Sequence, residues 1–190
     1  MAEAQLILIR HARADTQGRL AGRRDVPAIL DDAEGLARLR GALGSPAKIV
    51  TSPALRCRQT ANALFGERAG AEDDRLWEQD FGDHEGVPFE DIPDLGPLPR
   101  ADLATVTPPG GEGFADMVAR VTPALRNLAG EALTIGPIVV VAHAGTVRAG
   151  LALALGDMSA ALAFEVEPLS ATRIRCLPGA MSVMSVNHVA

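Results

Sequence analysis

The stretch that decides the fold is Leu6-Ile7-Leu8-Ile9-Arg10-His11-Ala12, in which four apolar residues are followed at once by an arginine and a histidine. Runs that are apolar at every position are typical of strands buried on both faces, as in parallel sheets. Ile138-Val139-Val140-Val141 is a second run of this kind, and Lys48-Ile49-Val50-Thr51 is a shorter candidate. We therefore expect three buried strands at residues 6–9, 48–51 and 138–141.

Apolar residues at helical spacing separate these strands, with polar caps and glycines at the expected helix ends. Pro123 is expected to kink one of the helices or to restart it, with Thr122 as the new cap. The first expected helix is capped by Asp31 or Asp32, carries Leu36, Leu39 and Leu43 and stops at Gly44, and the second is opened by Ser52-Pro53 and runs to about Phe65. The third carries Phe114, Met117, Val118, Val121, Leu125 and Leu128. The fourth carries Val147, Leu151 and Leu155 and ends at Gly156.

The alternation of strands and helices predicts an α/β fold, a three-layer α/β/α sandwich with a largely parallel central sheet and helices on both faces. The tail from about residue 161 to 189 alternates in short β-like runs, which indicates a meander. A length of 190 residues fits a single domain. Residues 86–113 hold six prolines and form an irregular excursion. Because long loops in compact domains are often functional, we expect this excursion to shape the substrate site.

Composition argues against several classes of function. A net charge of −6 does not suit non-specific nucleic-acid binding, which needs a broad basic surface. No apolar stretch approaches the ~18 residues that span a bilayer, and the first residues lack the basic region of a signal peptide. We therefore expect a cytoplasmic protein that binds neither nucleic acid nor membrane. Several arginines nevertheless crowd the first third of the chain, which suits a small anionic ligand: Arg10, Arg13, Arg19, Arg23, Arg24, Arg56 and Arg58.

Basic residues follow three of the expected strands. Arg10 and His11 come directly after the first strand, Arg56 lies in the first turn of the helix after the second, and His143 follows the third. Ligands of open α/β sheets bind beyond the carboxyl ends of the strands. The two arginines and two histidines are therefore expected to meet at one place.

Such a set matches the needs of phosphoryl transfer. The transferring group spreads negative charge over three oxygens, which arginines grip through paired N–H donors, and a neutral imidazole can attack phosphorus. The sequence contains no Walker motif, no H-E-x-x-H and no comparable metal-binding cluster, so cationic side chains would take the place of Mg²⁺. A leaving alcohol also needs a proton, and the segment from residue 76 to 86 offers four carboxylates as the acid: Glu78, Asp80, Asp83 and Glu85.

Four segments together resemble the histidine phosphatase superfamily, which includes the cofactor-dependent phosphoglycerate mutases. Residues 8–12 (LIRHA) resemble its Arg-His-Gly signature, residues 51–61 (TSPALRCRQTA) its second-arginine motif, residues 78–86 (EQDFGDHEG) its acid-bearing motif and residues 141–145 (VAHAG) its second-histidine motif. They occur in the family's order and span residues 6 to about 150.

The resemblance implies the role of each residue. His11 would be the phosphohistidine nucleophile, and Arg10, Arg56 and His143 would bind the phosphate and stabilise its transition state. Glu78, rather than Glu85, occupies the family position of the proton donor. Gln17, Arg23 and Ala144 are further candidates for contact with the substrate, and no metal or other cofactor is implied. Ala12 and Ala144 replace the commoner glycines, Gln17 stands where many members have Asn, and His84 replaces a frequent Trp.

Within the superfamily, residues 18–27, 81–86 and 108–113 are similar to the alpha-ribazole phosphatase branch, which removes phosphate from a cobalamin precursor. The leading interpretation is thus a phosphomonoesterase that acts on a small phosphorylated metabolite. One alternative is phosphoglycerate mutase-type transfer, which the chain length disfavours. Another is a non-catalytic phosphate-binding module, since fold does not fix function. The sequence leaves the oligomeric state open.

Overall fold

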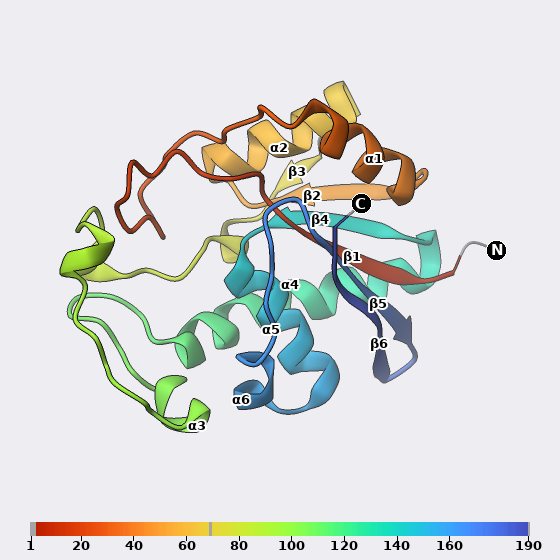
Figure 1. Ribbon diagram of the computed structural model, residues 1–190. Coiled ribbons are helices and arrows are strands. Elements are labelled where there is room, and N and C mark those ends of the chain that lie inside the picture. The colour runs from red at the N-terminus through yellow and green to blue at the C-terminus, as the bar shows by residue number, and fades with distance from the viewer. Residues whose placement is uncertain (1–2, 69, 190) are drawn as a thin grey trace.

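A six-stranded sheet in the order β3-β2-β4-β1-β5-β6 forms the centre of the computed structural model, which describes residues 3–68 and 70–189 (Figure 1). The first four strands in this order are parallel to one another, and β5 and β6 are antiparallel to their neighbours. The predicted largely parallel sheet is confirmed. The strands are β1 (Gln5–Arg10), β2 (Lys48–Thr51), β3 (Ala71–Glu72), β4 (Ile138–Ala142), β5 (Ala171–Leu177) and β6 (Ala180–His188).

Helices cover both faces of the sheet and complete the predicted three layers. Figure 1 shows α1 and α2 above the sheet, and α4, α5 and α6 below it. The short α3 lies apart, in the excursion. The helices are α1 (Ala33–Leu43), α2 (Leu55–Phe65), α3 (Arg100–Leu103), α4 (Phe114–Ile135), α5 (Ala144–Leu155) and α6 (Met158–Ala161).

Each central strand contributes side chains to two separate cores, one on each face of the sheet, which explains why the strand sequences are apolar at every position. Leu6 and Leu8 of β1 pack into the core shared with α4 and α5, whereas Ile7 and Ile9 pack into the core shared with α1 and α2. Successive strand side chains point to opposite faces. β4 lies between β1 and β2 and is buried along its whole length.

Two helix predictions from the sequence need correction. α2 begins at Leu55 with Ala54 as its N-cap, so Ser52 does not open the helix. α4 is one helix of 22 residues that passes through Pro123, so of the two predicted outcomes, a kink or a restart at Thr122, the restart is wrong. Proline inside a helix costs about 3 kcal/mol or more. The apolar residues on either side of Pro123, among them Met117 and Leu125, lie in one buried stripe, and their packing favours a continuous helix.

Other predicted ends agree with the structure. Asp32 caps α1 by accepting a hydrogen bond from the backbone N–H of Gly35, Gly44 ends α1, and Gly156 ends α5 in a left-handed conformation. The expected meander in the tail is a hairpin, β5 and β6, which extends the sheet from β1.

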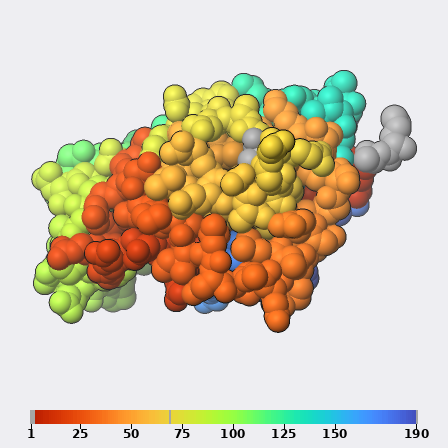
Figure 2. All heavy atoms as spheres, turned by 90° about the horizontal axis from the view of Figure 1, so that it is seen from above, coloured from red at the N-terminus to blue at the C-terminus, as the bar shows by residue number. Residues whose placement is uncertain are grey.

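The excursion at residues 86–113 packs against the loop that follows β1. Backbone hydrogen bonds join Leu20 to Val87 and Gly86 to Leu20, with donor–acceptor distances of 2.9 and 2.8 Å. Figure 2 shows the two segments side by side at one end of the molecule, in red-orange and yellow-green. Within the described part of the chain, no helix has both the length and the apolar character needed to cross a membrane.

Candidate active site

The site lies where β1, β2 and β4 end. Hydrogen bonds of the sheet continue one residue past the strands: the His11 N–H donates to the Ala142 carbonyl at 2.9 Å, and the Ser52 N–H donates to the Val141 carbonyl at 3.0 Å. His143 follows Ala142 directly and is the N-cap of α5. The sheet therefore brings His11, Ser52 and His143 to one edge.

The ring of His11 is fixed in one tautomer by its contacts. Nδ1 lies 2.6 Å from the carbonyl oxygen of Ala12, which can only accept, so Nδ1 carries the proton. Nε2 faces the guanidinium of Arg56, whose Nε donates to it across 3.3 Å. Nε2 of His11 is therefore an unprotonated nitrogen with a lone pair, beside a cation.

Arg56 is 1% exposed and lies between the two histidines. Its Nη2 is 3.3 Å from Nδ1 of His143, and the same nitrogen donates to the carbonyl of Gly22 at 2.7 Å. Nη1 donates to the carbonyl of Arg24 at 3.0 Å. Arg56 thus orients both imidazole rings and fixes the loop after β1.

Ser52 holds the far side of the His143 ring, with its Oγ 2.8 Å from Nε2. Because Nδ1 of His143 accepts from Arg56, Nε2 carries the proton and donates it to Ser52. The ring of Trp77 stacks on that of His143 at a centroid distance of 6.5 Å, and the His11 ring meets it edge-on at 5.1 Å.

Burial keeps both histidines neutral. Desolvation, followed by the positive charge of Arg56, lowers the pKa of His11 from 6.5 to about 3. The pKa of His143 also falls well below its ordinary value, first because of burial and then because of His11 and Arg56. Burial raises the pKa of the neighbouring Cys57 thiol, which lies 3.5 Å from Nε2 of His143. Cys57 is therefore a protonated packing group and His11 a neutral base at physiological pH.

Glu78 enters the site from the segment before residue 82 and is half-buried. Its carboxylate accepts from the N–H of Gln79 at 3.1 Å and from the N–H of Gly145, at the start of α5, at 3.5 Å. A Cβ on Gly145 would lie 2.2 Å from Oε1 of Glu78, so the glycine is what allows this approach. Glu78 is also close enough to Arg10 to raise the pKa of that arginine against the larger, lowering effect of burial.

Glu85, the other candidate acid from the family motif, is occupied elsewhere. Its carboxylate accepts hydrogen bonds from the backbone N–H groups of Gly22, Arg23, Arg24 and Phe81, at distances from 2.7 to 3.2 Å. Glu85 therefore anchors the loop after β1, and Glu78 is the one of the two candidate acids that lies near Arg10.

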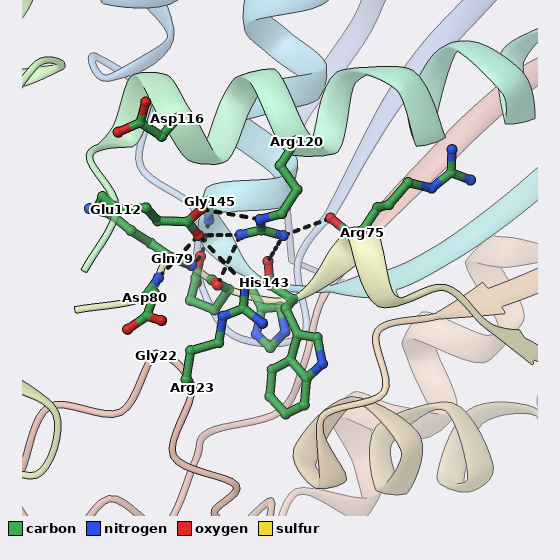
Figure 3. Close-up of polar contacts among 12 residues, drawn as sticks. Gly22, Arg23, Arg75, Gln79, Asp80, Glu112, Asp116, Arg120, His143 and Gly145 are labelled. Atoms are coloured by element: carbon green, nitrogen blue, oxygen red, sulfur yellow. Dashed lines mark hydrogen bonds and ion pairs between the residues drawn. The ribbon is translucent and has the colours of Figure 1, made fainter. Parts of the chain in front are cut away.

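Arg120 of α4 holds the segment that carries Glu78 (Figure 3). Its guanidinium donates to the carbonyls of Arg75, Trp77 and Glu78 at 2.8, 3.0 and 3.2 Å and pairs with the carboxylate of Glu112. Figure 3 shows Arg120 reaching toward this segment from the helix above it. Arg120 and Glu112 thus tie the acid-bearing segment to both α4 and the end of the excursion.

Two arginines near the cluster have donors that nothing in the described chain accepts. Nε of Arg10 and Nε of Arg23 are buried without a hydrogen-bond partner among the described residues. Arg10 also donates from Nη1 to the carbonyl of Val166 at 2.6 Å, and Arg23 lies over the ring of Trp77, 5.6 Å from its centroid. Buried donors are normally satisfied, so these two are available to an anion.

Two other predicted contact residues are placed differently. Gln17 is exposed, has φ of 52° and lines a separate surface hollow with Arg19 and Phe89. The structure does not bring it to the histidines. Ala144, by contrast, is the first residue of α5 and follows His143 directly. Within residues 3–68 and 70–189, no group of three or more His, Cys, Asp or Glu is arranged to hold a metal ion.

Comparisons with known proteins show which family the chain belongs to. The sequence model described as "Histidine phosphatase superfamily (branch 1)" matches residues 6–189. The chain belongs to this superfamily. Its predicted resemblance to the superfamily is confirmed.

Curated relatives come from mycobacteria. A bifunctional protein of Mycobacterium tuberculosis is 34% identical over 176 residues, a match that covers 83% of this chain and 46% of that protein. The chain thus spans about half the length of the first relatives it matches. A glucosyl-3-phosphoglycerate phosphatase of Mycolicibacterium vanbaalenii is 30% identical over 171 residues, covering 80% of this chain and 74% of that enzyme.

Solved structures share the whole fold. A mycobacterial glucosyl-3-phosphoglycerate phosphatase superposes with a TM-score of 0.83 at 27% identity, covering 98% of this chain and 100% of the other. The alpha-ribazole phosphatase of Shigella flexneri has a TM-score of 0.83 at 23% identity, over 98% and 97% of the two chains, and shows the fold alone.

Sequence reasoning missed three contributors to the site: Ser52 as the partner of His143, Trp77 and Arg120. The Ser52-Pro53 pattern predicts a helix cap and gives no sign of a partner 91 residues away. For Arg120 a signal exists, because an arginine three residues after Met117 interrupts the apolar face of a long helix.

Proposed function

We propose that this protein is a phosphomonoesterase that works through a phosphohistidine on Nε2 of His11. The observation that supports this most directly is the set of donors around that nitrogen. Arg56 Nε faces the lone pair of His11 across 3.3 Å, and Arg10, whose Nε has no hydrogen-bond partner among the described residues, is near enough to lower the pKa of His11. A phosphoryl group on this nitrogen would need such positive charge.

In the first step, the lone pair of His11 Nε2 forms a bond to phosphorus while the bond to the leaving-group oxygen breaks. Arg56 and Arg10 balance the charge of the phosphoryl oxygens, and the departing oxygen takes the proton of the Glu78 carboxylic acid. The fixed proton on Nδ1 of His11 is shared with the Ala12 carbonyl, which stabilises the ring as it becomes positively charged.

In the second step, the Glu78 carboxylate takes a proton from water as the water oxygen attacks phosphorus. The N–P bond breaks, inorganic phosphate leaves, and His11 returns to its neutral form with Glu78 protonated. The same groups therefore serve both steps, and no charge accumulates over the cycle.

The test is hydrolysis of p-nitrophenyl phosphate by the purified protein in EDTA. We expect turnover that EDTA does not reduce. A protein that turns over no phosphate ester, or only with an added divalent metal ion, would contradict the proposal.

For the substrate, we propose alpha-ribazole 5′-phosphate, supported by the similarity of residues 18–27, 81–86 and 108–113 to that branch. The mycobacterial relatives named for glucosyl-3-phosphoglycerate provide the competing substrate. Comparing kcat/KM for the two esters tests the assignment: a preference of at least about tenfold for glucosyl-3-phosphoglycerate would overturn it. A cytoplasmic location stays a prediction, and the two free buried cysteines suit a reducing compartment.

A further inference from the structure

A hollow of about 340 Å³ lies between the excursion, the acid-bearing segment and α5. Most of its wall is apolar, and the apolar lining includes Leu20, Phe81, Ile92, Leu95, Leu103 and Phe114. The volume lies within the range of small-molecule sites, roughly 300–1,000 Å³. Leu95 and Leu103 are 49% and 38% exposed, so this apolar surface is reachable from outside.

The hollow lies next to the segment that carries Glu78, the proposed acid. Gln79 lines it and donates its backbone N–H to Glu78. Phe81 also lines it, and its ring lies against Gly22, whose carbonyl holds Arg56. The wall of the hollow therefore includes one residue that contacts Glu78 and one that lies against Gly22, the partner of Arg56.

α5 contacts both Glu78 and the hollow. Its first turn contacts Glu78 through Gly145, and Arg148, one turn further along, lines the hollow. The guanidinium of Arg148 donates from Nε to the carbonyl of Phe164 at 3.2 Å. Its charge is also near enough to Arg10 to lower the pKa of that arginine. Arg148 thus marks the border between the charged site and the apolar hollow.

A leaving group must extend past the acid that protonates its oxygen. We propose that the hollow binds the leaving group of the substrate and selects phosphate monoesters with an apolar body, such as a ring or an alkyl chain. This inference rests on the proposed function, because it takes the phosphoryl group to lie at His11. The hydroxyl groups of a leaving group such as glycerol would lie against Phe81, Leu95 and Leu103, which offer no hydrogen-bond partner. The polar side chains of the wall are those of Gln79, His84 and Arg148.

The experiment uses methyl, propyl, butyl and hexyl phosphate, whose leaving alcohols have similar acidities. The chemistry is thus constant while the apolar surface grows. We expect kcat/KM to rise about two- to fourfold for each methylene that enters the hollow. Propyl phosphate should also exceed glycerol 3-phosphate, which has the same carbon chain with two added hydroxyls, by about tenfold or more.

Variants then locate the effect. Leu95→Asn and Leu103→Asn should flatten the dependence on chain length, and both residues are exposed enough to leave the core intact. The matched control is Leu177→Asn, a similarly exposed leucine (45%) at the end of β5 that lies away from His11, and this variant should keep the wild-type slope. Turnover of the alkyl series without any rise in kcat/KM, or an unchanged slope in both pocket variants, would overturn the inference and leave the proposed function standing. No turnover of any ester would instead remove the proposed function.

Discussion

Arg56 and His11 form a buried donor–acceptor pair, with Nε of the arginine 3.3 Å from Nε2 of the histidine. Because a guanidinium only donates, the histidine nitrogen that faces it must be unprotonated. The same arginine lowers the pKa of His11. In the proposed mechanism, Arg56 would also bind the phosphate that His11 attacks, so one residue would support both the nucleophile and the binding of its target.

His11 should stay neutral in the free protein from pH 8 down to pH 5, since its pKa lies at about 3. The measurement is a pH titration of the histidine ring nitrogens by NMR. We expect the Nδ1–H tautomer of His11 throughout this range. A ring that titrates near 6.5 would show that burial does not depress its pKa.

The same shift makes stability depend on pH. An unfolded histidine titrates near 6.5, so between pH 6.5 and about 3 the unfolded chain binds more protons than the folded one. The contribution of the neutral histidine to the free energy of unfolding is fully present above pH 6.5 and is lost as the pH is lowered through this window. The loss is up to about 1.4 kcal/mol per pH unit for each such histidine. Urea unfolding at pH 7 and pH 5 measures this fall, and His11→Gln should lose one histidine's share of it.

Ser52→Ala removes the partner of Nε2 in His143 and leaves a buried N–H unsatisfied. We expect a loss of about 1–3 kcal/mol in the free energy of unfolding, together with a lower kcat. Ser170→Ala is the control, since the Oγ of Ser170 is buried with no hydrogen-bond partner in the described chain. Equal effects of the two substitutions would mean that the Ser52–His143 contact has no special role.

Arg120→Met should release the segment that carries Glu78. Because Glu78 would then be poorly placed, we expect kcat for butyl phosphate to fall about 10- to 100-fold. A general acid contributes about 10²–10⁴-fold in rate, so this variant should lose only part of that contribution. Turnover of p-nitrophenyl phosphate, whose leaving group needs little protonation, should fall less. Arg126→Met, an exposed arginine on the same helix, is the control. A uniform loss on both esters would point to a general structural role.

Much of this arrangement could be predicted from the sequence. The apolar runs at residues 6–9 and 138–141 specified doubly buried strands, and parallel strands bring the residues after them to one edge. His11, Arg56 and His143 could therefore be placed together before any coordinates were known. Propensity could not decide the path of α4 through Pro123, because its packing on the sheet sets the outcome.

Contacts between distant segments were harder to predict. The pairing of Ser52 with His143, and of Arg120 with three carbonyl groups, depends on how loops pack and leaves little periodic signal. Gln17 was predicted from the family pattern to bind substrate, yet its backbone has a positive φ and its side chain lies in a separate hollow. The prolines of the excursion predict an irregular segment but give no information on its path, so the apolar hollow beside it could not be predicted.

The central claim is that His11 carries the phosphoryl group, and trapping that intermediate tests it most directly. Protein mixed with p-nitrophenyl phosphate would be quenched in alkali, which preserves phosphohistidine, and its peptides analysed by mass spectrometry. Glu78→Gln should increase the trapped fraction, because it removes the base that activates water but is not needed for nitrophenolate to leave. We predict one phosphoryl group on His11, and none in His11→Ala, which should also lose at least about 10³-fold in activity. Active protein with no phosphate on His11, or with phosphate on another residue, would contradict the account.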